Sequence, residues 1–380
     1  MKNDFITPYL NRIIFFSRKI YRFFYRLLIF NKGFWGSLFM KNRPMTHEID
    51  FVVLWVDGND LKWRKEKDKY KKEILNKSKE DGEERYRDWN LFHYWFRGVE
   101  KYAPWVRNVF LVTCGQTPQW ININHPKLRL VNHEDFIDNR YLPTFNSSAI
   151  EINLHKIKDL GEYFVFFNDD MFLTRPVKPE DFFQDGEPLI CSAGFPIHNF
   201  NNDVWDHMQF TIMGLANKYN WASIINKNPY KWFYYKYKDY LRYNWRMYKD
   251  SYMFGFFYVH FASPFRKTSL IKAENTFPEE FKQTSQSKFR SPYNISQQLI
   301  KICAIANGDF SPCSTDHFGI YRNIDEYHLP SIIASIKNQN EMMVCINDSC
   351  DITKQNFELF QNKISEALES ILPEKSSFEI

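Results

Sequence analysis

Four short, uninterrupted apolar runs alternate with helical stretches between residues 50 and 167, and this alternation restricts the fold more than any other feature of the sequence. An apolar run of this length that ends in turn residues is typical of a strand buried on both faces of a sheet. Strands that alternate with helices indicate a parallel sheet with helical crossovers. The runs cover residues 50–56, 108–114, 128–131 and 163–167, and the helical stretches cover 61–80, 89–102 and 147–160. We therefore expect a mainly parallel α/β sheet flanked by helices.

Acidic clusters follow two of these runs, at 57–60 (DGND) and at 168–170 (NDD). In a parallel sheet, ligands bind outside the carboxyl ends of the strands. Adjacent carboxylates at such an end suit Mg²⁺ or Mn²⁺, which take one or two protein oxygens and complete their shell with phosphate and water. The alternative is a turn that caps the next segment, because Asp, Asn and Gly are favoured turn residues. The pattern alone leaves both interpretations open at 168–170 and favours the turn at Asp57-Gly58.

Glycine is scarce, with 13 in 380 residues, about half of the ordinary usage of roughly 7%. Neither G-x-G-x-x-G nor G-x-x-x-x-G-K-[ST] occurs, so the backbone loops that hold dinucleotides or nucleoside triphosphates are missing. If the protein handles phosphate, side chains or a metal ion must do most of the work.

The six cysteines are dispersed, with no C-x-x-C pair and no histidine at ligand spacing. This pattern indicates neither a zinc cage nor a disulfide scaffold and fits a reducing, cytosolic setting. The N-terminal apolar stretch is interrupted by arginines and has no small-residue cleavage site, so we expect no signal peptide. It also contains no charge-free window of 18 residues and is therefore not expected to span a membrane.

The N-terminal segment holds the basic character of the chain: residues 1–47 carry nine Lys or Arg against one Asp, in a protein of net charge +5. On a helix, five cations fall on one side and six apolar residues lie mostly opposite. They are Arg12, Arg18, Lys19, Arg22 and Arg26, and Ile13, Phe16, Ile20, Phe24, Leu27 and Leu28. This layout predicts that residues 9–30 bind an anionic membrane surface. The alternative is a helix docked on the protein's own core or on a partner. Nucleic acid is disfavoured, because the cations alternate with Phe and Ile.

Two further residues gain interest only in combination. A lone histidine in an aromatic setting, such as His260, is usually a core or surface residue, and Arg290 alone would be a surface cation. A histidine that takes up a proton near neutral pH, arginines that bind phosphate oxygens and carboxylates that hold a metal are together suited to phosphoryl transfer.

Four ordered segments extend this combination into a pattern. The first is 49–60 (IDFVVLWVDGND), and the second combines 85–88 (RYRD), 102–106 (YAPWV), 142–147 (LPTFNS), 149–151 (AIE) and 167–172 (FNDDMF). The third combines 260–267 (HFASPFRK), 277–281 (FPEEF) and 289–291 (FRS), and the fourth 345–349 (CINDS) and 372–379 (LPEKSSFE). In these segments the chain resembles the Stealth family, which includes bacterial capsular polysaccharide phosphotransferases and the catalytic subunit precursor of the lysosomal-enzyme GlcNAc-1-phosphotransferase.

The resemblance implies a Rossmann-like, GT-A-like sheet and a phosphotransferase. Its reaction would move a sugar-1-phosphate from a nucleotide-activated sugar to a hydroxyl of a glycan acceptor, forming a phosphodiester in capsular or other cell-surface polysaccharide, with Mg²⁺ or Mn²⁺ as cofactor. By the same resemblance His260 is the general base, and Arg290 stabilises the transferred phosphoryl group. The implied catalytic residues are His260, Arg290, Asp169 and Asp170, the substrate-binding residues are Asp57, Gly58, Asn168 and Arg266, and the metal ligands are Asp169, Asp170 and Asp348.

The chain then divides into four expected parts. Residues 1–46 form the membrane-interface segment, 47–199 the α/β part for nucleotide sugar and metal, 200–258 a helical, aromatic-rich insertion, and 259–380 the remainder of the catalytic domain. The expected location is cytoplasmic, peripheral on the inner face of the cell membrane. The aromatics of 229–258 are compatible with a homo-oligomer or a glycan assembly complex. Two other functions stay open: a metal-dependent glycosyltransferase, and a noncatalytic membrane scaffold of such a complex.

Overall fold

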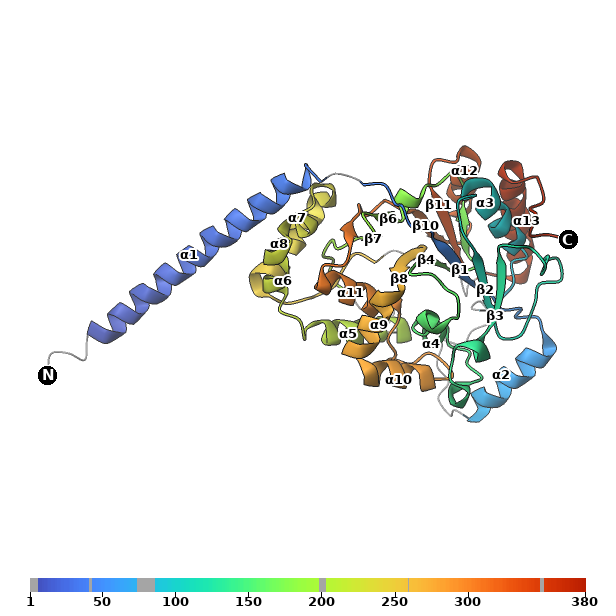
Figure 1. Cartoon of the computed structure of the whole chain (residues 1–380), viewed down its shortest axis with the longest axis horizontal. Helices are drawn as coiled ribbons and strands as arrows, with labels where there is room; N and C mark the ends of the chain where they lie inside the picture. The colour runs from blue at the N-terminus through green and yellow to red at the C-terminus, as the bar shows by residue number, and fades with distance from the viewer. Residues whose placement is uncertain (1–5, 41–42, 74–85, 198–202, 259, 349–351) are drawn as a thin grey trace.

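A five-stranded sheet lies at the centre of the body in the computed structural model, which describes all residues except 1–5, 41–42, 74–85, 198–202, 259 and 349–351 (Figure 1). Its strand order is β3-β2-β1-β4-β8. The strands are β1 (Asp50–Leu54), β2 (Val109–Thr113), β3 (Leu128–Asn132), β4 (Tyr163–Phe167) and β8 (Ser263–Arg266). The first four run parallel, and β8 runs antiparallel to β4. The predicted mainly parallel sheet is confirmed, with all four predicted strands.

Burial on both faces explains why the apolar runs form strands. Successive residues of a strand point to opposite faces, so a strand covered on both sides must be apolar throughout. Phe51 and Val53 of β1 belong to the core that includes α3 (Phe92–Tyr102) and α13 (Lys354–Ile371). Val52 between them belongs to the opposite core, which includes α9 (Lys267–Thr276) and α11 (Gln297–Asn307). Each such side chain contributes about 1.5–3 kcal/mol through burial.

Two small sheets complete the strands, and the sequence did not predict them. One has the order β10-β11-β5 and the other β6-β7-β9. Their bounds are β5 (Met171–Leu173), β6 (Phe183–Gln184), β7 (Glu187–Ile190), β9 (Ser311–Pro312), β10 (Gly319–Asn323) and β11 (Met343–Asn347). Because β5 begins directly after Asp170 and pairs with β11, the first of these sheets stands beside the end of β4.

One predicted helix is much shorter than expected. In place of a helix over 147–160, α4 covers Ser147–Glu151 and a 3₁₀ turn follows at Leu154–Lys156. Asn153 Nδ2 donates a hydrogen bond to the carbonyl of Ala149 at 2.8 Å. In a continuing helix, this carbonyl would accept from the backbone N–H of Asn153 instead. That N–H bonds the carbonyl of Ile150 at 3.1 Å and tightens the chain. The other helices outside the insertion are α2 (Leu61–Glu73), α10 (Pro278–Gln286) and α12 (Leu329–Asn338).

The stretch predicted to be a helical insertion is mostly helical. Its helices are α5 (Val204–Ala216), α6 (Trp221–Lys227), α7 (Pro229–Trp232) and α8 (Leu241–Asp250). Many of its aromatics are structural: Trp221, Trp232 and Tyr237 are fully buried. The aromatic excess therefore contributes to the core of this segment as well as to its surface.

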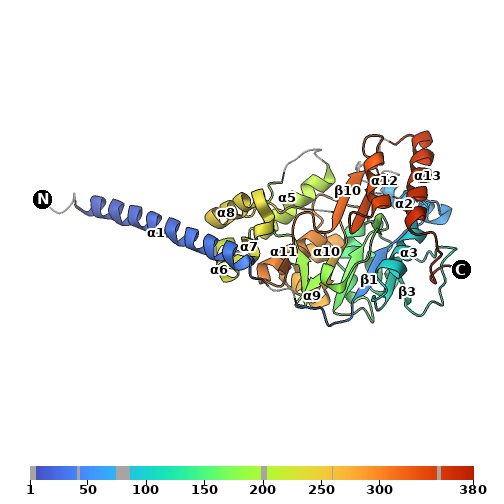
Figure 2. The same ribbon diagram turned by 90° about the horizontal axis from the view of Figure 1, so that it is seen from above.

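The N-terminal helix α1 (Ile6–Ser37) projects from the body, and only its last turns pack on it (Figures 1 and 2). Phe30 contacts Phe233 and Trp245, with ring centroids 4.8 and 5.7 Å apart. At Gly33 a Cβ would lie 2.5 Å from the carbonyl oxygen of Pro229, so this close approach requires glycine. The docking alternative is thus correct for the end of the helix.

The earlier part of α1 leaves its apolar side chains uncovered. Phe16 and Leu28, for example, are 66% and 65% exposed. Among the helices of the described residues, none combines the length and the apolar character needed to cross a bilayer. The side chains of residues 6–14, which include Arg12 and Ile13, lie outside the description.

Candidate active site

The turns that follow β1 and β2 form one wall of the candidate site. The backbone N–H of Asp57 donates to Gln116 Oε1 at 2.8 Å, and Gln116 Nε2 donates to Asp60 Oδ2 at 3.1 Å. Gly58 allows this turn to touch the segment before Asp88, because a Cβ there would lie 1.6 Å from the carbonyl oxygen of Tyr86. The structure therefore packs the predicted Asp57-Gly58 turn against a second acidic segment.

His260 meets the end of β4 at the same edge of the sheet. Its Nε2 lies 3.2 Å from Asn168 Nδ2 and 3.5 Å from Asp170 Oδ2. The side chains of His260 and Asp170 are 26% and 25% exposed, so solvent and small solutes reach them. The Asn168 amide can donate to an unprotonated Nε2, while the Asp170 carboxylate stabilises the imidazolium that forms when this nitrogen takes a proton. The arrangement suits a general base.

Desolvation, reinforced by repulsion between carboxylates, raises pKa values at this edge of the sheet. Desolvation, followed by the charges of Asp170 and Asp88, raises the pKa of Asp169 to about 8, although part of the residue is exposed at the surface of the site. Burial, with a contribution from Asp57, also raises the pKa of Asp88. A divalent cation would relieve this repulsion.

The donor atoms around Asp170 fit a cation. Asp170 Oδ1 is buried and has no hydrogen-bond partner among the described residues. Oxygen donors of this kind suit Mg²⁺ or Mn²⁺. Asp170, His260 and the buried Cys345 also bring one ligand atom each within 4.8 Å of one another.

Arg290 belongs to a neighbouring polar group. Its Nη2 donates to Ser147 Oγ, the first residue of α4, at 2.7 Å. Burial and the charge of Glu151 raise the pKa of Tyr258, and Arg290 opposes this shift. Tyr258 precedes His260 by two residues, so Arg290 and Glu151 lie close to the segment that carries the histidine.

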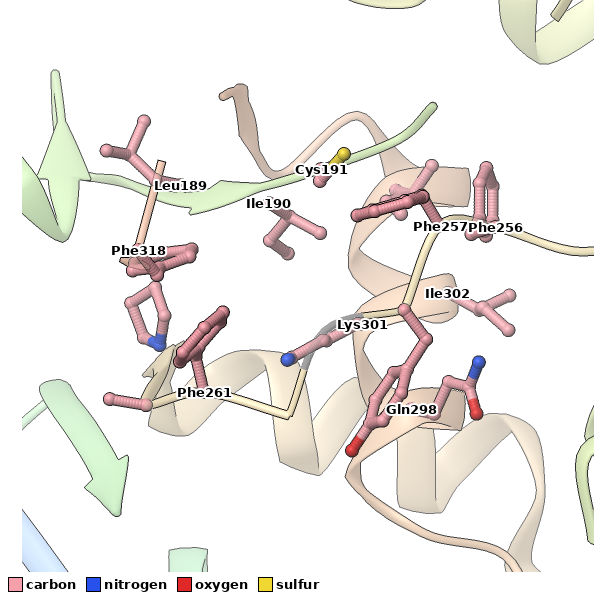
Figure 3. A pocket seen from close by; sticks show the side chains of 14 residues that line it. Leu189, Ile190, Cys191, Phe256, Phe257, Phe261, Gln298, Lys301, Ile302 and Phe318 are labelled. Carbon is pink, nitrogen blue, oxygen red and sulfur yellow. The ribbon is translucent and has the colours of Figure 1, made fainter. Parts of the chain in front are cut away.

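A cavity of about 40 Å³ adjoins the same segment and is walled largely by apolar side chains, several of them aromatic (Figure 3). Lys301, from α11, points into it toward Phe261. Its ammonium lies 5.9 Å from the ring centroid of Tyr258 and has no hydrogen bond or ion pair with any described residue. Burial lowers the pKa of Lys301 to about 8.

Two predicted site residues lie elsewhere or are otherwise engaged. Arg266 pairs in register with Tyr163, at the start of β4, and its Nε lies 3.2 Å from Glu162. Because β8 is antiparallel to β4, this position is at the opposite edge of the sheet from Asp170. Asp348 accepts from Trp89 Nε1 at 3.0 Å and pairs with Arg87 Nε at 3.2 Å. The carboxylate that was predicted to bind a metal ion is thus engaged by Trp89 and Arg87.

Sequence reasoning assigned no role to four residues that the structure brings to the site, namely Asp88, Glu151, Tyr258 and Cys345. Asp88, Glu151 and Cys345 lie inside segments that carry the family resemblance, which was a usable signal. Tyr258 had no such signal, because it stands in a run of aromatics of which several are core residues.

Comparison with known proteins assigns this arrangement to a family. Three Stealth regions match the chain: conserved region 1 over residues 47–74, conserved region 2 over 85–189 and conserved region 3 over 259–299. The capsular polysaccharide phosphotransferase WcwK of Streptococcus pneumoniae is 37% identical over 342 residues, covering 90% of this chain and 99% of its own. The chain belongs to the Stealth family.

Other Stealth relatives match at similar levels. The receptor polysaccharide phosphotransferase WefC of Streptococcus gordonii is 38% identical over 341 residues, covering 88% of this chain and all of its own (100%). The exopolysaccharide phosphotransferase cps2G of Lactiplantibacillus plantarum is 35% identical over 350 residues, covering 90% and 99%. A solved galactosyltransferase, LgtC, aligns with 83% of this chain and 95% of its own, at 11% identity and a TM-score of 0.35, too low to support any argument.

Each matched Stealth region contributes a different part of the site. Region 1 supplies the turn with Asp57 and Gly58, region 2 supplies the end of β4, and region 3 supplies His260 and Arg290. The fourth segment of the sequence resemblance, at 345–349 and 372–379, stays a prediction, and residue 349 lies outside the described residues.

Proposed function

We propose that this Stealth protein is a sugar-phosphate transferase that moves a sugar-1-phosphate from a nucleotide-activated sugar to a hydroxyl of a glycan acceptor. The product is a phosphodiester link in capsular or other cell-surface polysaccharide. The observation that carries the proposal is the contact of His260 Nε2 with both Asn168 and Asp170 at the strand ends. The names of the full-length relatives as phosphotransferases support it.

In this reaction His260 Nε2 takes the proton of the acceptor hydroxyl as its oxygen attacks the β-phosphorus. A new O–P bond forms, the bond between the β-phosphorus and the bridging oxygen breaks, and a nucleoside monophosphate leaves. Asp170 stabilises the imidazolium, and Arg290 stabilises charge on the transferred phosphoryl oxygens. Phosphoryl transfer depends chiefly on such positioning and charge neutralisation.

Asp169 and Asp170 are the residues that would hold Mg²⁺ or Mn²⁺, with Asn168 beside them. The ion would neutralise the pyrophosphate of the donor. The Asp57-Gly58 turn lies beside Asp88 and is proposed to contact the nucleotide. Arg266 and Asp348 are left out of this assignment, because Arg266 pairs with Glu162 and Asp348 pairs with Arg87.

Product analysis separates this function from a glycosyltransferase. A panel of nucleotide sugars is incubated with an acceptor glycan and Mg²⁺ or Mn²⁺, and the leaving nucleotide and the phosphorus in the new linkage are measured by mass spectrometry and ³¹P NMR. We expect a nucleoside monophosphate and a phosphodiester. Release of a nucleoside diphosphate with a phosphorus-free product would refute the proposal.

A second test separates the enzyme from a noncatalytic scaffold. His260→Asn replaces the imidazole by a polar amide that cannot act as a base. It should lower turnover at least ~10²-fold, the lower range for loss of a general base. His207→Asn, on α5, is the matched control and should keep normal turnover. A scaffold would support glycan synthesis equally well with either substitution.

We also propose that the protein is peripheral on the cytoplasmic face of the membrane, anchored by α1. The exposed apolar side chains of its outer part and the neighbouring cations support this interpretation. Phe16→Glu with Phe24→Glu should abolish binding to vesicles of anionic phospholipid while leaving turnover on a soluble acceptor intact. Tyr327→Glu is the control, because Tyr327 is also an exposed aromatic residue, with 86% of its surface accessible, but it lies outside α1. Equal vesicle binding by both variants would refute the anchor.

A further inference from the structure

Three potential ligand atoms of different chemistry converge at the proposed base. They belong to the Asp170 carboxylate, the His260 imidazole and the Cys345 thiol, and all lie within 4.8 Å of one another. This set contains a sulfur and a nitrogen, which Mg²⁺ does not favour and which Zn²⁺ and related thiophilic cations do. The site therefore presents two kinds of donor set around one shared carboxylate.

The distance between the nitrogen and the carboxylate oxygen is close to that in a tetrahedral zinc centre. In such a centre, ligand atoms bound at ordinary Zn–O, Zn–N and Zn–S lengths are separated by about 3.3–3.6 Å. His260 Nε2 and Asp170 Oδ2 are already 3.5 Å apart. Because the three ligand atoms lie within 4.8 Å of one another, the thiol needs to move by at most about 1.5 Å, a shift that rotation of a side chain provides. A water molecule can fill the fourth position on the solvent side.

The surroundings fix two of the three ligands. The backbone N–H of Ile346 donates to the carbonyl of Asp170 at 2.9 Å, and Cys345 pairs in register with Met171. Asp170 and Cys345 are thus held next to each other by the β5–β11 ladder. Asp170 Oδ1 is buried and has no hydrogen-bond partner among the described residues, so this carboxylate retains unused acceptor capacity on its inner side.

We propose that Asp170, His260 and Cys345 form a binding site for a thiophilic divalent cation of the Zn²⁺ class, and that its occupation blocks the transferase. Binding forms a bond from the metal to each of Sγ, Nε2 and one carboxylate oxygen, and the thiol proton is released to solvent. Because its lone pair is bound to the metal, Nε2 can then no longer take the proton of the acceptor glycan's hydroxyl. The inhibitory part of this inference rests on the proposed function.

Cobalt absorption tests the site without any substrate. The full-length protein is titrated with Co²⁺ in magnesium-free buffer, and the near-ultraviolet thiolate-to-cobalt band is recorded. We expect the band in the wild type and in the control Cys303→Ser, whose cysteine is equally buried but lies in the opposite core. Cys345→Ser and His260→Asn should lose the band or weaken Co²⁺ binding at least about tenfold. A band that persists in Cys345→Ser, or no band in the wild type, would overturn the proposal.

Inhibition provides the second measurement. Zn²⁺ is added to the Mg²⁺-supported reaction, and the release of nucleoside monophosphate is followed as a fraction of each variant's own rate. The Zn²⁺ concentration for half inhibition should rise at least about tenfold in Cys345→Ser and stay unchanged in Cys303→Ser. An unchanged value in Cys345→Ser would refute the block. If the cobalt band is found and no monophosphate is ever released, the metal site stands and the proposed function fails.

Discussion

Replacing Lys301 by methionine should stabilise the protein at neutral pH, which is the opposite of what most core substitutions do. Burial beside the apolar cavity lowers the pKa of Lys301 from 10.5 to about 8, and no ion pair with a described residue compensates the charge. One pKa unit corresponds to about 1.4 kcal/mol, so the charged ammonium costs the folded state roughly 3 kcal/mol. Partial exposure of the side chain screens some of this cost, and we expect a gain of about 1–3 kcal/mol in the free energy of unfolding.

The gain should disappear at high pH. Because the pKa is lowered in the folded state, the unfolded chain retains a proton between about pH 8 and 10.5 that the folded protein has released. The penalty is full below this window and absent above it, so the stability of the wild type rises through the window relative to that of Lys301→Met. The two proteins should therefore differ at pH 7 and become similar near pH 10.5.

Urea unfolding followed by tryptophan fluorescence at pH 7 and at pH 10 measures this difference. Lys272→Met is the matched control, because Lys272 is exposed on α9 and pairs with Asp309 at 2.5 Å, and its loss should not stabilise the protein at either pH. The reasoning is refuted if Lys301→Met is less stable than the wild type at pH 7, or if its gain does not change with pH. Turnover of the same variant shows whether the lysine also contributes to the reaction.

Three further predictions concern the site. Gly58→Ala should reduce turnover by at least tenfold in the nucleoside monophosphate assay, because its Cβ would collide with the Tyr86 carbonyl and displace the Asp57 turn from Asp88. The pKa of Asp169 is raised to about 8, so without metal the stability should fall as the pH rises from about 4 to 8. Asp169→Asn should remove this decline in thermal unfolding, and saturating Mn²⁺ should reduce it in the wild type. Asp348→Asn should lower the free energy of unfolding by about 1–3 kcal/mol through loss of its half-buried ion pair with Arg87, without changing Mn²⁺ affinity in a direct titration.

The central sheet was predictable because its signal is local. A strand buried on both faces, such as β1, must be apolar along its length, and that requirement is visible in the four consecutive residues 51–54, while the buried Asp50 before them is paired with Arg107. The shortening of α4 was not predictable from the local sequence. The Asn153 side chain donates hydrogen bonds both to the carbonyl of Ala149 and to the hydroxyl of Ser285, which is far along the chain. β5 has only three residues and forms a strand because β11 pairs with it, so its sequence alone carries no periodicity to recognise.

The candidate site was predictable to the extent that strand direction could be assumed. Acidic residues after β1 and β4 were expected at one edge because parallel strands share their carboxyl ends. The direction of β8 has no local signature, and its antiparallel pairing takes Arg266 to the other edge while leaving His260, just before the strand, at the site. The partner of a charged side chain cannot be identified from the sequence either. Asp348 has a carboxylate that could bind a metal ion, but in the structure it forms an ion pair with Arg87 and accepts a hydrogen bond from Trp89.

The pairing of β5 with β11 places the small sheet beside the candidate site. Asp170 is the last of the three residues between β4 and β5. Its backbone is held from both sides, by the end of β4 before it and by the hydrogen bond from the Ile346 N–H to its carbonyl. His260 approaches Asp170 from another segment altogether. A packing change in β11 that shifts this carboxylate by a fraction of an ångström would alter the His260–Asp170 contact directly, since a base and its charge partner depend on geometry within about 0.5 Å. Under the proposed function, turnover is therefore expected to depend on the packing of β11 through the position of Asp170.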